Sequence, residues 1–237
     1  MDENATSQNA KNPIGRRLFL GLLALGAAGV VFGEKVQNFT STKLGSGVGS
    51  LLPGGDHFRI YSVSGKYPLI PTDEFRLEIK GLVDRPMMLG FDELRALPSI
   101  AIVKDFQCVT GWRVPGVHWK GVRLSHLLSI AGVQENAVAV NFESYDGMDT
   151  ESLSLSETQI PDVIVAYEMY GETVTREHGG PVRLVVPQMF GYKSIKWLKS
   201  IRVADQQVPG YWEQNGYPVN GWLDGWTGPN DPNPNLS

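Results

Sequence analysis

The chain of 237 residues has one cysteine, Cys108, so it cannot form a disulfide within itself. Its four histidines include no H-x-x-x-H pair, and no second cysteine is available to complete a zinc site. The C-x-x-C-H motif that attaches a haem is absent, as are a P-loop and a G-x-G-x-x-G that follows a strand. The formal net charge is −4, without a basic stripe beyond the N-terminal region, which argues against nucleic acid as a partner.

The cysteine follows a short apolar stretch, residues 100–103, whose composition predicts a β-strand. Gly111 and Pro115 are expected to break any regular element after it. We therefore expect Cys108 where a strand leaves the core and a loop begins, a common position for reactive groups. The alternative is a buried thiol that packs as a small apolar side chain.

The N-terminal region resembles an export signal. Arg16 and Arg17 precede an apolar segment, residues 18–32, which is shorter than the roughly 20 residues that span a bilayer. Paired arginines before such a segment are typical of twin-arginine signals. We interpret residues 1–33 as a twin-arginine signal or, if uncleaved, an N-terminal membrane anchor. The protein is then exported across the cytoplasmic membrane to the periplasm or cell-surface side, where an accessible free thiol risks oxidation and a metal would protect it.

Composition divides the remaining chain into three parts. Residues 34–55 are rich in glycine, serine and threonine, as in a flexible linker. Residues 56–205 have the apolar content of one domain with a real core. Residues 206–237 are rich in proline, glycine, asparagine and tryptophan, and we expect a tail that wraps the surface and is partly disordered.

Strands dominate the pattern of residues 56–205. Apolar residues at every second position, as in Phe75, Leu77 and Ile79, predict half-buried strands. The predicted strands cover residues 75–81, 99–108, 137–144, 153–155, 162–170, 173–175, 181–187 and 195–203, and the predicted short helices cover 91–97 and 124–131. The fold class is therefore a mixed, strand-rich α+β domain with short helices and not a doubly wound sheet.

A second chemically dense stretch follows the predicted hairpin. Arg183 lies inside an apolar strand, where a charge must pair with a carboxylate or bind an anion. Lys193, Ser194 and Lys196 follow a glycine turn, and this combination suits a phosphate. His178 stands beside Gly-Gly-Pro and has a better claim to a functional role than the other histidines.

Three motifs carry a family resemblance over about residues 58–203. They read A-Y-E-M at 166–169, H-G-G-P-V-R-L-V-V-P at 178–187 and G-Y-K-S-I-K-W-L at 191–198. Together with a cysteine at a strand end, they resemble the molybdopterin-binding domain of the sulfite oxidase family. The exported methionine sulfoxide reductase catalytic subunits belong to the same superfamily and share twin-arginine export.

The resemblance implies a role for each matching residue. Cys108 would supply the thiolate ligand to molybdenum, and the pterin dithiolene would supply two further sulfurs. His178 and Arg183 would contact the cofactor, with Arg183 at its phosphate. Ser194 and Lys196 would contact the pterin.

Two further residues match the family less closely. Ser144 resembles a hydroxyl contact of the reductase branch. Arg113 follows Cys108 by five residues, and an arginine at this spacing serves the anionic substrate pocket of sulfite oxidases; a surface salt bridge is the alternative. Residues 61–63 read Tyr-Ser-Val where sulfite oxidases have Arg-Asn-His, and no tyrosine matches their catalytic tyrosine, although Tyr145 is near.

The resemblance implies an exported molybdenum-molybdopterin oxidoreductase that transfers oxygen atoms on a small oxyanion such as sulfite. No haem is expected in the chain, so electrons would be exchanged with a separate membrane haem protein or cytochrome. One alternative is a reductase of sulfoxides, including methionine sulfoxide in proteins. Another is a non-catalytic binding module, against which the joint presence of Cys108, His178, Arg183 and Lys196 argues.

Overall fold

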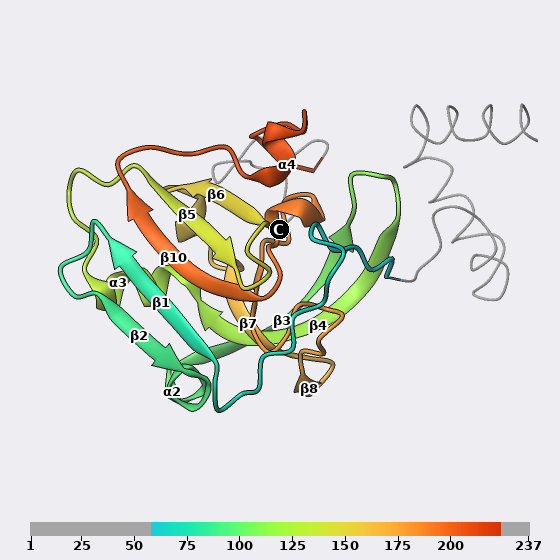
Figure 1. Ribbon diagram of the computed structural model, residues 1–237, viewed down its shortest axis with the longest axis horizontal. Coiled ribbons are helices and arrows are strands. Elements are labelled where there is room, and N and C mark those ends of the chain that lie inside the picture. The colour runs from blue at the N-terminus through green and yellow to red at the C-terminus, as the bar shows by residue number, and fades with distance from the viewer. Residues whose placement is uncertain (1–57, 224–237) are drawn as a thin grey trace, which may run out of the picture. The chain divides into compact units, whose positions relative to one another are not determined.

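The structure is a computed structural model that describes residues 58–223 (Figure 1). The predicted signal (1–33), the predicted linker (34–55) and residues 224–237 of the predicted tail lie outside the described residues. Within the described range, no helix is long and apolar enough to cross a membrane.

Two five-stranded sheets form the framework, and the mixed α+β class predicted from the sequence is confirmed. In the first sheet β1 and β10 are parallel and the other neighbours antiparallel. Its order is β2 (Met87–Gly90), β1 (Arg76–Gly81), β10 (Leu198–Ala204), β5 (Ala139–Ser144) and β6 (Thr150–Ser154). The second, antiparallel sheet runs β3 (Ser99–Gln107), β4 (Arg113–Arg123), β7 (Ile164–Met169) and β8 (Glu172–Thr173), with β9 (Arg183–Val185) also paired to β7.

The helices are short, as predicted. They are α2 (Phe91–Ala96), α3 (Leu124–Ala131), α4 (Tyr211–Gln214) and the 3-10 turns η2 (Glu157–Gln159) and η3 (Gly191–Lys193). In α3 the buried residues recur at helical spacing, from Leu124 through Leu128 to Ala131. The helix ends at Gly132, whose φ of 72° is the left-handed conformation that glycine adopts freely.

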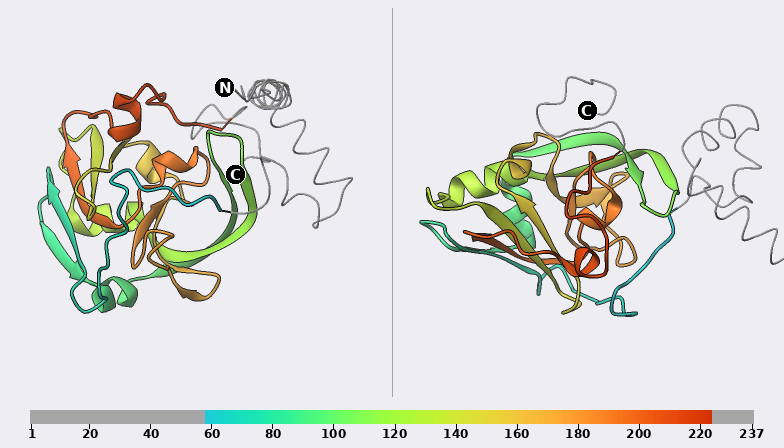
Figure 2. Two further views of the ribbon diagram at one scale, coloured as in Figure 1. Left: turned by 45° about the vertical axis from the view of Figure 1, so that its right-hand side comes forward. Right: turned by 90° about the horizontal axis from the view of Figure 1, so that it is seen from above.

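The main core lies between the two sheets. Leu77 and Ile79 of β1 and Leu184 of β9 are all fully buried there, with α3 packed against the same cluster. A second core cluster around Trp112 and Trp119 packs the β3–β4 hairpin against residues of β7 and β9. This hairpin is long and curved and extends past the other strands (Figures 1 and 2), so its tip can form one wall of a pocket.

The structure corrects several strand predictions, and β2 and β4 were not among the predicted strands. Pro115 does not end regular structure, because β4 runs through it; Pro115 and Gly116 lie opposite Asp105, where the register of the β3–β4 pair shifts. A proline fits such a bulge because no ladder hydrogen bond is required of it. The last strand starts at Leu198 and not at residue 195, because Trp197 has a φ of 50°, which is outside the strand region. The indole N–H of Trp197 donates to the carbonyl of Arg176 (2.8 Å).

Candidate functional site

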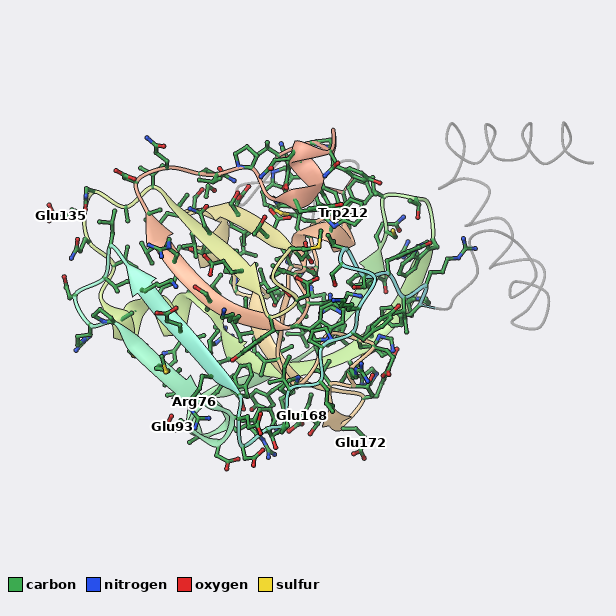
Figure 3. The ribbon with its side chains drawn as sticks, viewed as in Figure 1. Arg76, Glu93, Glu135, Glu168, Glu172 and Trp212 are labelled. Atoms are coloured by element: carbon green, nitrogen blue, oxygen red, sulfur yellow. The ribbon has the colours of Figure 1, made fainter. Side chains whose placement is uncertain are left out.

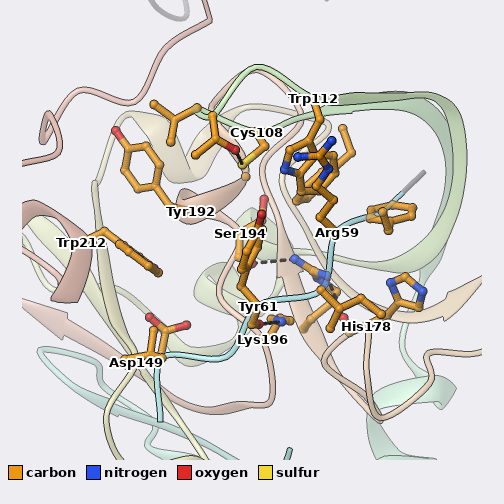
Figure 4. Close-up of a pocket in the computed structure, with 18 of the residues that line it drawn as sticks. Arg59, Tyr61, Cys108, Trp112, Asp149, His178, Tyr192, Ser194, Lys196 and Trp212 are labelled. Atoms are coloured by element: carbon orange, nitrogen blue, oxygen red, sulfur yellow. Dashed lines mark hydrogen bonds between the residues drawn. The ribbon is translucent and has the colours of Figure 1, made fainter. Parts of the chain in front are cut away.

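A pocket of about 280 Å³ opens among parts of the chain that are distant in sequence (Figure 4). Small-molecule sites have volumes of about 300–1,000 Å³, so this pocket lies near the lower end of that range. The wall is formed by residues 58–63, the end of β3 with its loop, the β5–β6 turn, the segment before β9, η3 with the bend after it, and the tail around α4.

The sulfur of Cys108 is held at this wall by a tight turn at the end of β3. The backbone N–H of Cys108 donates to the carbonyl of Trp112 (2.8 Å), and the N–H of Gly111 donates to the carbonyl of Cys108 (3.0 Å). The thiol is partly buried and lies 3.2 Å from the Thr110 hydroxyl. The predicted position of the cysteine at a strand end is therefore what the structure shows, and the thiol faces a pocket.

Arg183 brings a buried positive charge to the pocket. Its side chain on β9 donates to the carbonyls of His178 (2.7 Å) and Ser194 (2.7 Å), and its residue is 3% exposed. Its guanidinium lies over the rings of Phe106 and Trp119. Within residues 58–223 no carboxylate forms an ion pair with it, so the salt-bridge alternative is not observed.

The electrostatics of the pocket are those of an anion site. Burial lowers the pKa of Arg183 to about 10, so the guanidinium stays charged at neutral pH. Burial, and then Arg183, lower the pKa of Lys196 to about 8. Burial and both cations lower the pKa of His178 below its ordinary value, which favours the neutral imidazole. An anion that entered would relieve the repulsion between these groups and the cost of their burial.

Five of the seven predicted site residues line this one pocket: Cys108, His178, Arg183, Ser194 and Lys196. The Ser194 hydroxyl accepts from the backbone N–H of Val186 (2.9 Å). The Lys196 ammonium donates to the carbonyl of Tyr61 and lies over the Trp197 ring.

The other two predicted residues lie outside the lining. Ser144 is buried at the end of β5, where its hydroxyl accepts from the N–H of Asp146 (3.1 Å) in the β5–β6 turn. Arg113 pairs with Asp105 across the β3–β4 bulge. The structure thus gives Arg113 the salt bridge that was the alternative prediction.

Lys193 has a different role from the one its sequence position indicated. Its ammonium is buried and bonds to carboxylates of Glu151 on β6 and Glu213 on α4, and to the carbonyl of Ser152. We refer to Lys193, Glu151 and Glu213 as the buried triad. The triad connects the tail to the framework, so Lys193 is not available to an anion in the pocket.

Several lining residues were not predicted from the sequence. Asp149 lies in the β5–β6 turn, where a carboxylate in a polar turn is expected to face solvent. Tyr192, Trp212 and Tyr217 form an aromatic wall, in which the ring centroids of neighbours lie 5.3 Å apart. Trp212 belongs to α4, on the other side of the domain from Arg76 (Figure 3); the aromatic residues of the tail were the only signal that could have indicated it.

Similarity to known proteins defines the class of protein to which the chain belongs. Residues 64–212 match the family described as “Oxidoreductase molybdopterin binding domain”, and the chain belongs to this family. The uncharacterized oxidoreductase YuiH of Bacillus subtilis is 36% identical over 174 residues, which are 70% of this chain and 86% of YuiH. The protein is therefore a molybdopterin-dependent oxidoreductase of the sulfite oxidase type.

Two further relatives differ in the activity that their names state. Sulfite oxidase of Arabidopsis thaliana is 30% identical over 200 residues, 70% of this chain and 47% of that protein. The protein-methionine-sulfoxide reductase catalytic subunit MsrP of Gluconobacter oxydans is 34% identical over 155 residues, 58% of this chain and 49% of MsrP. The chain thus spans about half the length of these two relatives. The sulfane dehydrogenase SoxCD of Paracoccus pantotrophus has the same fold, with a TM-score of 0.55, 24% identity and coverage of 64% of this chain and 46% of that one.

The pocket fits a molybdopterin. Cys108 offers a soft thiolate ligand, and Arg183 is a buried cation that lacks a counter-ion among the described residues. The indole N–H of Trp112, in the same wall, is buried with no hydrogen-bond acceptor, although such donors are normally paired. A cofactor with a metal, a phosphate and ring heteroatoms offers a partner to each of these three groups.

Proposed function

We propose that the protein transfers oxygen atoms to or from a sulfur compound at a molybdenum-molybdopterin held in this pocket. The observation that carries the proposal is that one cavity is lined by the Cys108 thiol and by the buried guanidinium of Arg183, which has no carboxylate partner among residues 58–223. When bound, the cofactor supplies the two-electron redox chemistry. The chain binds and orients the cofactor, and it shapes the space in which a substrate meets it.

Each pocket residue has a proposed task. Cys108, as thiolate, ligates the metal, and Arg183 holds the phosphate through its charge and fixed fork of donors. Lys196, Ser194 and the neutral His178 contact the pterin. The lysine adds a second positive charge, and the imidazole can donate or accept a hydrogen bond.

Ser144 and Arg113 remain predictions for cofactor and substrate binding respectively. Arg113 would have to leave Asp105 to reach a substrate. The pocket wall near Arg183 and Lys196 is aromatic and includes Phe106, Tyr192 and Trp212. Such a wall favours the apolar groups of a thioether over the dianion sulfite, since sulfur packs well against ring edges. A neutral organic sulfoxide is therefore the better supported substrate, ahead of the sulfite predicted from the sequence.

Export and electron exchange are part of the proposal. The twin arginines, Arg16 and Arg17, support export across the cytoplasmic membrane to the periplasm or cell-surface side, with the N-terminus cleaved or kept as an anchor. The relative YedZ1 of Azospira oryzae, named as a putative subunit of a protein-methionine-sulfoxide reductase, is 31% identical over 168 residues. We propose a separate membrane haem protein or cytochrome as the electron partner.

The test is a substrate panel run in both directions on cofactor-loaded protein. Reduced viologen dye serves as donor for dimethyl sulfoxide, aryl methyl sulfoxides and methionine sulfoxide, and ferricyanide serves as acceptor for sulfite. The expected result is turnover of sulfoxides that is lost in a Cys108→Ala variant. Sulfite oxidation without sulfoxide reduction would reverse the substrate assignment. No turnover in either direction by loaded protein would favour the non-catalytic module.

A further inference from the structure

Asp149 places a carboxyl group in the pocket that the proposed roles leave unused. It lies in the β5–β6 turn and is 8% exposed, and in Figure 4 it lies at the pocket wall, below Trp212 and to the left of Lys196. No hydrogen bond joins its side chain to any other described residue. Its oxygens are not among the fully buried side-chain atoms that lack a partner, so the carboxyl opens onto the pocket, where a bound molecule can reach it.

The charges that face Asp149 come from several elements. Asp146 lies in the same turn, Lys196 and Arg183 lie across the pocket, and Glu213 of the buried triad approaches from α4. Burial, and then Asp146, raise the pKa of Asp149 to about 7, and the two cations oppose this rise. A carboxyl with such a pKa is present in both protonation states near neutral pH, as proton transfer requires.

Three other groups at or near the pocket are less suited to proton transfer. Tyr192 donates to the carbonyl of Pro218 (2.7 Å), and burial raises its pKa further above the neutral range. Tyr145, the tyrosine near the family position, bonds instead to the backbone of Arg76 and is absent from the pocket wall. Burial and the adjacent cations lower the pKa of His178, which favours the neutral imidazole.

We propose that Asp149 is the proton donor and acceptor for oxygen transfer in this pocket. This inference rests on the proposed function. Reduction of a sulfoxide breaks its S–O bond, consumes two electrons and two protons and releases the thioether and water. The electrons come from the external reductant, and the protons pass to the departing oxygen through Asp149, which is recharged from solvent. In the reverse direction the carboxylate accepts the protons of water.

The test compares three variants of the cofactor-loaded protein with the wild type. Asp149→Asn removes the transferable proton, and Asp149→Glu retains a carboxyl group. Asp146→Asn is the matched control: it retains the oxygen that accepts from the N–H groups of Met148 and Asp149 and removes one negative charge beside Asp149. Metal content, the pH profile of sulfoxide reduction and carbon-13 NMR titration of the aspartate carboxyl groups are measured for each.

The expected results are specific to proton transfer. Wild-type kcat falls as pH rises through about 7, because the donor must be protonated. Asp149→Asn retains the metal but loses about 100-fold or more in kcat, the scale of general acid catalysis, together with the NMR signal that titrates near this pH. Asp149→Glu restores part of the rate. Asp146→Asn shifts the profile and the titration to lower pH, because it removes a charge that opposes ionisation of Asp149.

Four results would overturn the inference. One is an Asp149→Asn protein that is loaded and as active as the wild type, with the same pH profile. Another is an Asp149 carboxyl that titrates near the ordinary aspartate value of about 4. If Asp149→Asn does not fold or load, an unmoved profile in Asp146→Asn overturns it. Loaded wild-type protein that turns over neither sulfoxide nor sulfite overturns the proposed function as well.

Discussion

Replacement of Lys193 by methionine tests how the tail is attached to the framework. The ammonium of Lys193 bonds to Glu151, to Glu213 (2.6 Å) and to the carbonyl of Ser152 (2.9 Å), and the three charged side chains are each about 1% exposed. Methionine fills a similar volume without the charge. Removal of one partner of a buried ion pair costs about 3–5 kcal/mol, a large part of the roughly 5–15 kcal/mol that stabilises a domain.

The cost of Lys193→Met depends on pH in a defined direction. Without the ammonium, Glu151 loses the cation that favours its charged form, so its pKa in the folded state rises further above the unfolded value. Burial already raises the pKa of Glu151 well above its ordinary value. When the pKa of a carboxyl is raised in the folded state, the free energy of unfolding of the protein falls as pH rises through that pKa. The variant is therefore more destabilised at pH 8 than at pH 5.

Urea unfolding of wild type and variant at both pH values measures this effect, with linear extrapolation to water. Lys199→Met is the matched control, because Lys199 is exposed on β10, and it should change stability by no more than about 0.5 kcal/mol. A cost of Lys193→Met below about 1 kcal/mol at pH 8 would refute the reasoning, since it would mean that the triad is neither dry nor fully charged.

Three further predictions concern the framework and the pocket wall. Gly121→Ala places a methyl group 2.2 Å from the carbonyl oxygen of Val165, so β4 and β7 must move apart. The free energy of unfolding, measured with urea, should fall by about 2 kcal/mol or more. Arg183→Gln should reduce pterin content at least about tenfold, because the charge-assisted bonds to the phosphate are lost, whereas Arg183→Lys should retain more; equal contents in all three proteins would contradict this role. Trp212→Ala should raise KM for aryl methyl sulfoxides several-fold with less change in kcat, and an unchanged KM would place the substrate elsewhere.

Local pattern was sufficient to predict much of the framework, but β2 and β4 were missed. The bounds of α3 follow from buried residues at helical spacing and from Gly132 after them, and β3 follows from its apolar residues and its end near Cys108. The alternation in β1 is likewise visible in the sequence. The course of β4 through Pro115 was not predictable, because it depends on a register shift against β3 that no local pattern encodes.

The site was predicted where motif and burial agree. Arg183 was identified because a charge within an apolar strand requires an anionic partner. Lys193 and Lys196 are alike in local sequence, yet one is sealed in the buried triad and the other lines the pocket. Asp149 and Trp212 reach the pocket through tertiary contacts of a turn and of the tail. Such contacts have no signature in the local sequence.

The most direct test of the account is the molybdenum and pterin content of protein from a host that makes the cofactor. The account predicts about one molybdenum and one pterin per chain in the wild type. Cys108→Ala should retain the pterin, which other residues hold, and lose turnover. Wild-type protein from a competent host that contains neither molybdenum nor pterin would contradict the central claim.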